Sequence, residues 1–230
     1  MDPRRLTRYE ELRAEEPELF ANPPDGVIDI VTDPAAVAEA EKAARDRLVA
    51  AGRPADWADT GVVFEDQYSL IVRDAVRMPD GVLGTYFRSL VPAGIPGVVI
   101  LPILAGRVIL IRHFRHSTRQ WHLEVPRGFG DPGFTPEENA RRELLEEIGA
   151  SARTMVSLGL VYPDTGVTNN SVCLFLAEVD AVGVAQMDEG ISHLEPVTTS
   201  RFEQLIRDGE ITDGYSINAY ARAHVMNLLP

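Results

Sequence analysis

Three glutamates are packed into five residues near the middle of the chain, in the stretch RGFGDPGFTPEENARRELLEEIGA at positions 127–150. Glu143, Glu146 and Glu147 are spaced i, i+3 and i+4, so a helix would present them on one face. A solvated acidic face is one interpretation, because each like-charge pair costs only about 0.2–0.5 kcal/mol. The other is a cation site, in which carbonyls of the glycine-rich turn join the carboxylates. Ligands that are all oxygen favour Mg²⁺ or Mn²⁺.

The local sequence predicts where the helix that carries these glutamates begins and ends. Thr135 is a typical N-cap, Pro136 follows at the first helical position, and Glu138 stands three residues after Thr135, as in a capping box. Gly149 supplies the stop. At 3.6-residue spacing, one broad apolar face is expected from Ala140, Leu144, Leu145 and Ile148.

Positive charge is concentrated just ahead of the glutamates. The stretch RHFRHSTRQWH, residues 112–122, holds three arginines and three histidines. Arg115 and Arg112 are therefore candidates for binding an anionic substrate, with ordinary surface charge as the alternative for Arg112. His113 and His116 lack a suitably placed cysteine or third histidine, so we do not expect zinc.

Composition limits the classes of protein to consider. The 230 residues are 45% hydrophobic and 25% charged, which is ordinary for a globular protein. The net charge of -13 argues against general nucleic-acid binding. The N-terminus lacks the apolar core of a signal peptide, and the longest apolar stretch, GIPGVVILPILAG, is too short to cross a bilayer. The one cysteine, Cys173, is expected to be a buried thiol. We therefore expect a cytoplasmic protein with no membrane or nucleic-acid partner.

The pattern along the chain indicates the elements that position these residues. Besides the glutamate helix, helices are expected at residues 34–51, 200–209 and 216–228. Strands are expected at residues 62–78, 82–91, 97–104, 107–115, 121–126, 157–162 and 171–179. This order predicts an α/β fold with a mixed sheet rather than a regular βαβ array.

Gly128, followed at a fixed spacing by RELLEEIG at positions 142–149, resembles the Nudix box. Residues 97 to 227 also resemble the ADP-ribose pyrophosphatase branch of that family, through the stretches WHLEVPRG and RDGEITDGYSINAYARA. The resemblance implies a Nudix-like mixed sheet sandwiched between helices in residues 96–230. It does not cover residues 1–60, expected to be an N-terminal extension with a helix, which precede an N-terminal β region at 61–95.

Two positions depart from the family's pattern. Phe134 stands where the box has a glutamate, and Thr165 precedes a glycine where the branch usually has proline. In the family that glutamate supports the box arginine rather than the metal. We therefore expect Glu137 or Glu138 to pair with Arg142 instead.

The resemblance also implies chemical roles. Members of the family hydrolyse a nucleoside diphosphate linked to another moiety, and metal ions neutralise the diphosphate and lower the pKa of bound water. Glu143 and Glu147 are expected to be primary metal ligands, with Glu146 as a further ligand or the base. Arg142 would orient these carboxylates. The carbonyl of Arg127 would be a backbone ligand.

A catalytic base or a further ligand usually comes from a later loop. Asp188 and Glu189 have the best positions and Asp164 is second, while a solvated acidic turn is the alternative. Arg115 matches the arginine that the family's corresponding strand directs at the diphosphate. Glu124, in the stretch that leads to the box, is also expected at the substrate.

The β region at 61–95 is expected to form a homodimer, as in related pyrophosphatases. Two strands are too small to hold an isolated sheet. Their apolar faces are therefore expected to cover the catalytic domain or a second chain. Arg77 and Arg88 would then reach a substrate held by the neighbouring subunit.

The leading expectation is a Mg²⁺-dependent hydrolase that cleaves ADP-ribose to AMP and ribose 5-phosphate. Another nucleotide sugar or a dinucleotide is the nearest alternative as substrate. A non-catalytic Nudix-fold module that binds a nucleotide is a third possibility, which Phe134 and Thr165 would permit. The presence of all three glutamates favours chemistry.

Overall fold

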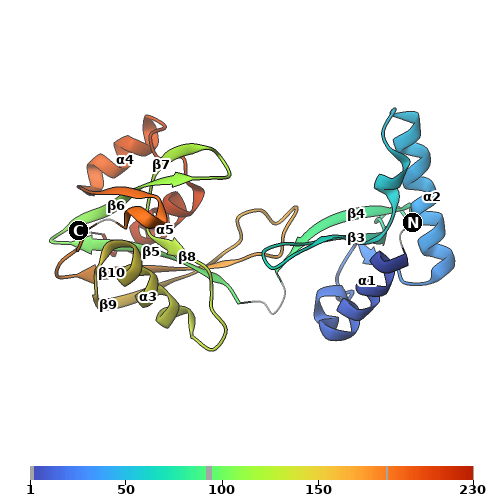
Figure 1. Ribbon diagram of the computed structural model, residues 1–230, viewed down its shortest axis with the longest axis horizontal. Coiled ribbons are helices and arrows are strands. Elements are labelled where there is room, and N and C mark those ends of the chain that lie inside the picture. The colour runs from blue at the N-terminus through green and yellow to red at the C-terminus, as the bar shows by residue number, and fades with distance from the viewer. Residues whose placement is uncertain (1–2, 92–94, 185, 230) are drawn as a thin grey trace. The chain divides into compact units, whose positions relative to one another are not determined.

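The computed structural model describes residues 3–91, 95–184 and 186–229. The chain forms two compact units (Figure 1), one made of Met1–Gly94 with Asp164–Asn170 and the other of Ile95–Pro163 with Ser171–Pro230. We call them the N-terminal unit and the C-terminal unit.

The N-terminal unit contains a small antiparallel sheet. Its strands are β1 (Asp29–Ile30), β2 (Gly61–Glu65), β3 (Leu70–Arg77) and β4 (Leu83–Leu90). Its helical segments are α1 (Pro3–Glu15), η1 (Pro17–Phe20), α2 (Pro34–Ala50) and η2 (Ala55–Ala58). β3 pairs with all three other strands. The segment 164–170 joins β4 through a bridge between Ser89 and Thr168.

Helices of the same unit cover both faces of this sheet. α1 and η1 bury Tyr9, Leu12 and Phe20 against the sheet residues Val62, Leu70, Val72 and Leu90. On the other face, Ala40 of α2 packs with Ala75 and Leu83. The prediction that the strands' apolar faces must cover the catalytic domain or a second chain is therefore wrong in its premise, because it counted two strands and left out the helices.

The C-terminal unit is built on a seven-stranded mixed sheet. The strands are β5 (Gly97–Leu104), β6 (Arg107–Arg115), β7 (Gln120–Glu124), β8 (Arg127–Gly128), β9 (Ala152–Val161), β10 (Val172–Val179) and β11 (Ile191–Val197). Their order is β11-β6-β5-β10-β9, with β7 beside β6 and β8 beside β5. β5 and β10 run parallel, whereas the other pairs are antiparallel.

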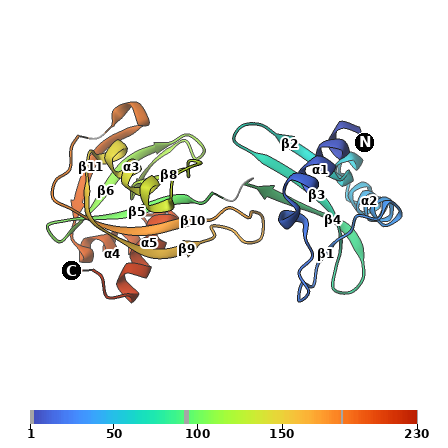
Figure 2. The same ribbon diagram turned by 90° about the horizontal axis from the view of Figure 1, so that it is seen from below.

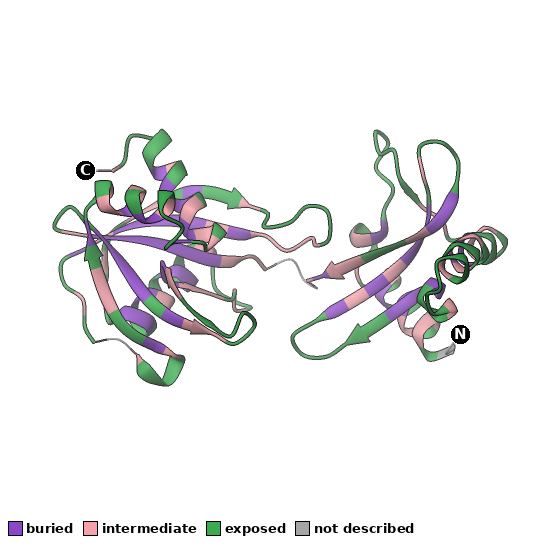
Figure 3. Cartoon of the chain, turned by 90° about the horizontal axis from the view of Figure 1, so that it is seen from above, coloured by how far each residue is buried: buried purple, intermediate pink, exposed green. Residues whose placement is uncertain are grey.

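Helices sandwich this sheet, as Figure 2 shows. The helical segments are α3 (Pro136–Ile148), η4 (Met187–Glu189), α4 (Thr199–Arg207) and α5 (Gly214–Val225). α3 packs on the face that presents Ile100 and Ile109, and α4 and α5 pack on the face that presents Leu101 and Leu110. Buried residues follow the central strands (Figure 3). The predicted α/β fold with helices on both sides of a mixed sheet is confirmed.

Several elements differ from the prediction. α1 was not expected, because its sequence PRRLTRYEELRAE is dominated by charged residues. Residues 62–78 form two strands rather than one, since the Asp66 carboxylate accepts backbone N–H bonds from Tyr68 and Ser69 and closes a turn. β11 was also missed. Within the described residues, no helix is long and apolar enough to cross a membrane.

Candidate active site

The glutamate helix α3 begins and ends as its sequence predicts. The Thr135 hydroxyl accepts from the backbone N–H of Glu138, whose carboxylate accepts from the backbone N–H of Thr135, which completes the capping box. Gly149 ends the helix in the left-handed conformation, at φ 62°. Leu145 is 54% exposed, so the predicted apolar face is narrower than expected.

The three glutamates lie at graded depths. Glu147 is buried at 3% exposure, the side chain of Glu143 is 13% exposed, and that of Glu146 is 48% exposed. Glu143 lies directly against Gly128, where an added Cβ would overlap its carboxyl group. Only glycine allows this close approach of the loop to the helix. The loop and the helix therefore meet at this carboxylate.

Burial makes the charged forms of these carboxylates costly unless a cation is present. Desolvation, with added repulsion from Glu143 and Glu124, raises the pKa of Glu147 to about 8, although Oε2 of Glu147 accepts a 3.0 Å bond from the backbone N–H of Arg127. Burial also raises the pKa of Glu143, and the charges of Glu146 and Glu189 add to that shift. Such a site favours a cation.

The chemistry of these groups fits a hard divalent ion. The donors are carboxylate oxygens, and Gly128 leaves room for the carboxylate of Glu143. In the part of the chain that the structure describes, no three Asp, Glu, His or Cys side chains form a ready-made metal cluster. Mg²⁺ does not require one, because it is commonly held by one or two carboxylates with water and substrate phosphate. Glu143 and Glu147 are the residues that could hold it.

Arg142 lies beside these carboxylates but pairs differently from the prediction. Its Nη1 donates to the carboxylate of Asp131, its Nη2 lies 3.4 Å from Glu143 and its Nε 3.7 Å from Glu146. The expected partners Glu137 and Glu138 are occupied elsewhere: Glu137 pairs with Arg141, and Glu138 is held in the helix cap. The expectation that either one replaces the missing glutamate is therefore wrong.

A second charged cluster is centred on Glu124, which is 1% exposed. It pairs with Arg115, with Nδ1 of His113 at 3.3 Å and with Nη2 of Arg127 at 3.5 Å. Burial alone would raise the pKa of Glu124, but the close contacts with His113 and Arg115 and the charge of Arg127 hold that pKa below its usual value. The charge of Arg115 also acts on Glu147, which links this cluster to the glutamates of α3.

Asp213 and Tyr215 also belong to this second cluster, and the sequence analysis missed both. Arg127 also lies 3.7 Å from Asp213 and 5.0 Å above the ring of Tyr215. Asp213 caps α5 by accepting from the N–H of Ser216. The stretch TDGYS could have predicted this cap, because Asp is a preferred N-cap and its carboxylate bonds the third residue on.

Other predicted residues are not brought to the glutamates by the described contacts. Arg112 lies on the opposite face of β6 from Arg115, since side chains alternate along a strand, and it stacks over Trp121 at 5.9 Å. Glu189 is in η4 and acts electrostatically on Glu143. Arg88 and Asp164 belong to the N-terminal unit.

Arg88 is engaged within its own unit. Its Nε lies 2.6 Å from Oδ2 of Asp74, its Nη1 donates to the carbonyl of Leu19 at 2.9 Å, and the guanidinium stacks on Phe20. Asp74 is 1% exposed and also accepts from the hydroxyl of Tyr9. These contacts stabilise the sheet, and a role of Arg88 toward substrate stays a prediction.

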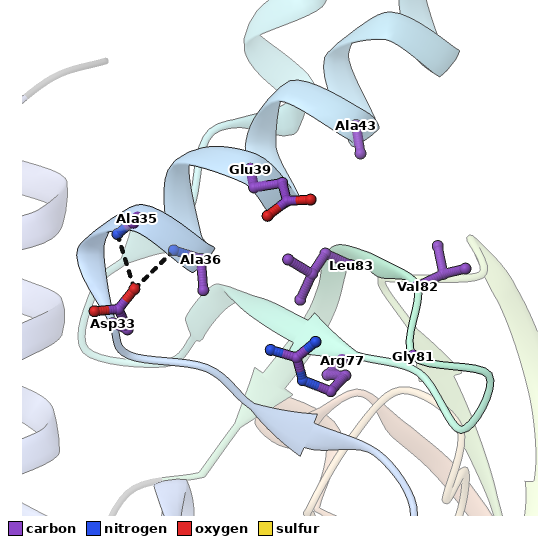
Figure 4. Close-up of a pocket in the computed structure, with 9 residues that line it drawn as sticks. All are labelled: Asp33, Ala35, Ala36, Glu39, Ala43, Arg77, Gly81, Val82 and Leu83. Atoms are coloured by element: carbon purple, nitrogen blue, oxygen red, sulfur yellow. Dashed lines mark hydrogen bonds between the residues drawn. The ribbon is translucent and has the colours of Figure 1, made fainter.

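A cavity of about 530 Å³ also lies in the N-terminal unit, between α2 and the β3–β4 hairpin. Figure 4 shows Arg77 and Glu39 facing it, beside the small side chains of Ala35, Ala36 and Ala43. Its lining contains none of the α3 glutamates, so we do not assign the reaction to it.

Comparison with known proteins places the site in a family. The model of the NUDIX domain matches residues 95–216, just over half of the chain. The chain is 30% identical to an ADP-ribose pyrophosphatase of Bacillus subtilis over 132 residues, which cover 55% of this chain and 70% of that protein. It is 37% identical to the ADP compounds hydrolase NudE of Escherichia coli over 83 residues, or 36% of this chain and 44% of that protein.

A solved structure is similar in fold. The crystal structure of an ADP compounds hydrolase superimposes with a TM-score of 0.65 at 20% identity, covering 73% of this chain and 91% of that one. The matched residues 95–216 include Gly128, the carboxylate helix α3 and the Glu124 cluster. The chain therefore belongs to the Nudix family and is a Nudix pyrophosphohydrolase.

Proposed function

We propose that the protein hydrolyses the diphosphate of ADP-ribose to AMP and ribose 5-phosphate with the help of Mg²⁺ or Mn²⁺. The observation that carries the proposal is the packing of Glu143 and Glu147 beneath the Gly128 loop, with Arg115 and Arg127 nearby in the Glu124 cluster. The names of the relatives in Bacillus subtilis and Escherichia coli support an ADP-containing substrate.

The carboxylates of the site would have different roles, which follow from their exposure and charge. Glu143 and Glu147 would hold the metal ion, with the backbone carbonyl of Arg127 as an added ligand. When bound, the ion neutralises diphosphate charge and lowers the pKa of bound water. Glu146 is the most exposed of the three carboxylates, so it is the best placed to accept a proton from the attacking water, with Glu189 as the alternative base.

Positive residues would bind the diphosphate. Arg115 is held by Glu124 at the end of β6, which fixes its guanidinium before substrate arrives. Such preorganisation favours the transition state, because no side chain must be ordered when charge develops. Glu124 acts here by holding Arg115 and Arg127 rather than by touching an anion. Arg112 lies on the other face of β6 and stacks over Trp121, so its role toward the substrate stays a prediction.

We also propose a two-fold symmetric homodimer formed through the N-terminal unit. Phe64 pairs with Ile71, and Phe87 with Arg73, so both aromatic rings share one face of the sheet. Phe64 is 49% exposed and Phe87 is 41% exposed. A second copy would cover this aromatic surface. In the dimer, Arg77 would be the candidate to approach the partner's substrate. Arg88 lies on the opposite face of β4 from Phe87 and is held by Asp74, so its approach to the partner's substrate stays a prediction. The single cysteine is consistent with a reducing, cytoplasmic setting.

A substrate panel tests the proposal. Purified protein is incubated with ADP-ribose, other nucleotide sugars and dinucleotides, each with and without Mg²⁺, and products are separated by chromatography. We expect AMP and ribose 5-phosphate from ADP-ribose only with the metal. Faster turnover of another compound would replace the substrate, and tight binding of ADP-ribose without turnover would indicate a non-catalytic module.

A further inference from the structure

The guanidinium of Arg142 is the link between the loop ahead of α3 and the carboxylates on it. Glu143 and Glu146, which belong to the same helix, lie 3.4 Å and 3.7 Å from Nη2 and Nε of Arg142. The carboxylate of Asp131 comes from the loop, and it makes the tightest contact with Arg142. Arg142 is therefore shared between one loop carboxylate and two site carboxylates.

The loop is folded so that Asp131 meets Arg142. The backbone N–H of Asp131 donates to Oδ1 of Asn139 at 3.3 Å, and the carbonyl of Asp131 accepts from the N–H of Phe134 at 3.4 Å. Asn139 is 1% exposed, and its Nδ2 has no hydrogen-bond partner within the described residues. Burying half of an amide without a partner costs free energy. Because the buried Asn139 side chain is present here despite that cost, we infer that it helps to hold the loop.

Phe134 completes the arrangement on another side of the guanidinium. Its ring lies 5.6 Å from Cζ of Arg142, within the range of a cation–π contact, and it is 53% exposed. A neutral ring attracts the guanidinium more weakly than a carboxylate does. Phe134 alone would therefore leave Arg142 free to move fully onto Glu143 and Glu146.

We propose that Asp131 is a positioning residue of this site: it draws Arg142 away from full pairing with Glu143 and Glu146 and so keeps these carboxylates available to a divalent cation. It thereby takes over the support that the Nudix box assigns to the glutamate missing at position 134. The inference rests on the proposed function, because the cation site is part of it.

The proposal makes a specific statement about compensation. Asp131→Asn removes the charge that holds Arg142, so the guanidinium competes with the cation for Glu143 and Glu146. Phe134→Glu places a carboxylate where the ring now meets the same guanidinium. In the double variant, the new glutamate should replace the lost aspartate.

The test measures Mn²⁺ affinity by electron paramagnetic resonance of the free ion, without substrate, together with the melting temperature. We expect Asp131→Asn to weaken Mn²⁺ binding about tenfold, in the range typical of residues that orient metal ligands, with little change in melting temperature. Asp131→Asn/Phe134→Glu should recover affinity to within about twofold of wild type. The matched control is Asp180→Asn, which removes an exposed carboxylate that faces Arg153 and should change neither quantity.

Three results would overturn the proposal. The first is a Mn²⁺ affinity of Asp131→Asn equal to wild type, and the second is an affinity that stays low in the folded double variant. The third is a parallel loss of melting temperature, which would make Asp131 a structural residue. Failure of the proposed function looks different. A wild-type protein that binds no Mn²⁺ would exclude the metal site itself. A wild-type protein that binds Mn²⁺ without cleaving ADP-ribose would contradict the substrate assignment, but the Mn²⁺ affinities of the Asp131 variants could still be compared.

Discussion

Close approach of Gly128 to Glu143 is the residue-scale feature on which the site depends. The loop backbone can lie against the carboxyl group only because position 128 has no Cβ. The same contact removes water from Glu143 and contributes to its raised pKa, whose largest cause is burial. The absence of a Cβ at position 128 therefore lets the loop contact this carboxylate directly.

Gly128→Ala tests this contact. The added methyl group overlaps the carboxyl group at the end of the flexible Glu143 side chain, so this carboxylate must move away from the loop. We therefore expect a large fall in kcat/KM with a loss in the free energy of unfolding that is smaller than the ~1–3 kcal/mol of an overpacked core. Urea denaturation and steady-state kinetics measure the two effects. Gly214→Ala is the control, since a Cβ there meets nothing within 4 Å. If Gly128→Ala and Gly214→Ala have the same kcat/KM and the same free energy of unfolding, the site does not depend on the contact between Gly128 and Glu143.

At the scale of elements, α3 could be predicted because residues close to its two ends determine where it begins and ends. Thr135, Pro136 and Gly149 each act on the backbone within a few residues of themselves. The face of the sheet on which each side chain lies was predicted less well. Both Arg112 and Arg115 were expected at the substrate, but an odd spacing along a strand sends them to opposite faces. The partner of Arg142 could not be predicted, because the choice of Asp131 over Glu137 depends on how the loop turns back on the helix.

Thr135→Ala tests the contribution of the cap to α3. The variant loses the hydroxyl that accepts from the N–H of Glu138, and we expect a loss of about 1 kcal/mol in the free energy of unfolding. Thr135→Ser retains that acceptor and should lose much less. Urea denaturation followed by circular dichroism distinguishes them. If Ala and Ser variants unfold together at the wild-type midpoint, the cap does not stabilise this helix.

On the scale of the whole molecule, sequence reasoning found a β region ahead of the Nudix domain but treated it as two strands in need of outside support. The structure gives that region its own core, because α1, η1 and α2 cover the sheet. Helix α1 escaped prediction since its apolar positions, Tyr9 and Leu12 among them, are outnumbered by charges. The case for a dimer now rests on the exposed rings of Phe64 and Phe87.

Light scattering tests the dimer at micromolar concentration. We expect a mass of about twice the 25.3 kDa of one chain, and a shift toward one chain in Phe64→Lys/Phe87→Lys, because charges would be buried between the copies. Tyr68→Lys is the control, since Tyr68 is 82% exposed in the turn between β2 and β3. A wild-type mass near 25.3 kDa would exclude the dimer and any site shared between subunits.

The most direct test of the central claim, that the carboxylates of α3 perform metal-dependent diphosphate hydrolysis, compares Glu147→Gln with wild type at saturating Mg²⁺ and ADP-ribose. The amide keeps the size of the buried side chain and removes its charge, so the protein should fold normally. We expect kcat to fall at least about 100-fold, since charge at a metal ligand acts on a transition state rich in negative charge. A kcat within a few-fold of wild type would contradict the assignment of Glu147 and the account built on it.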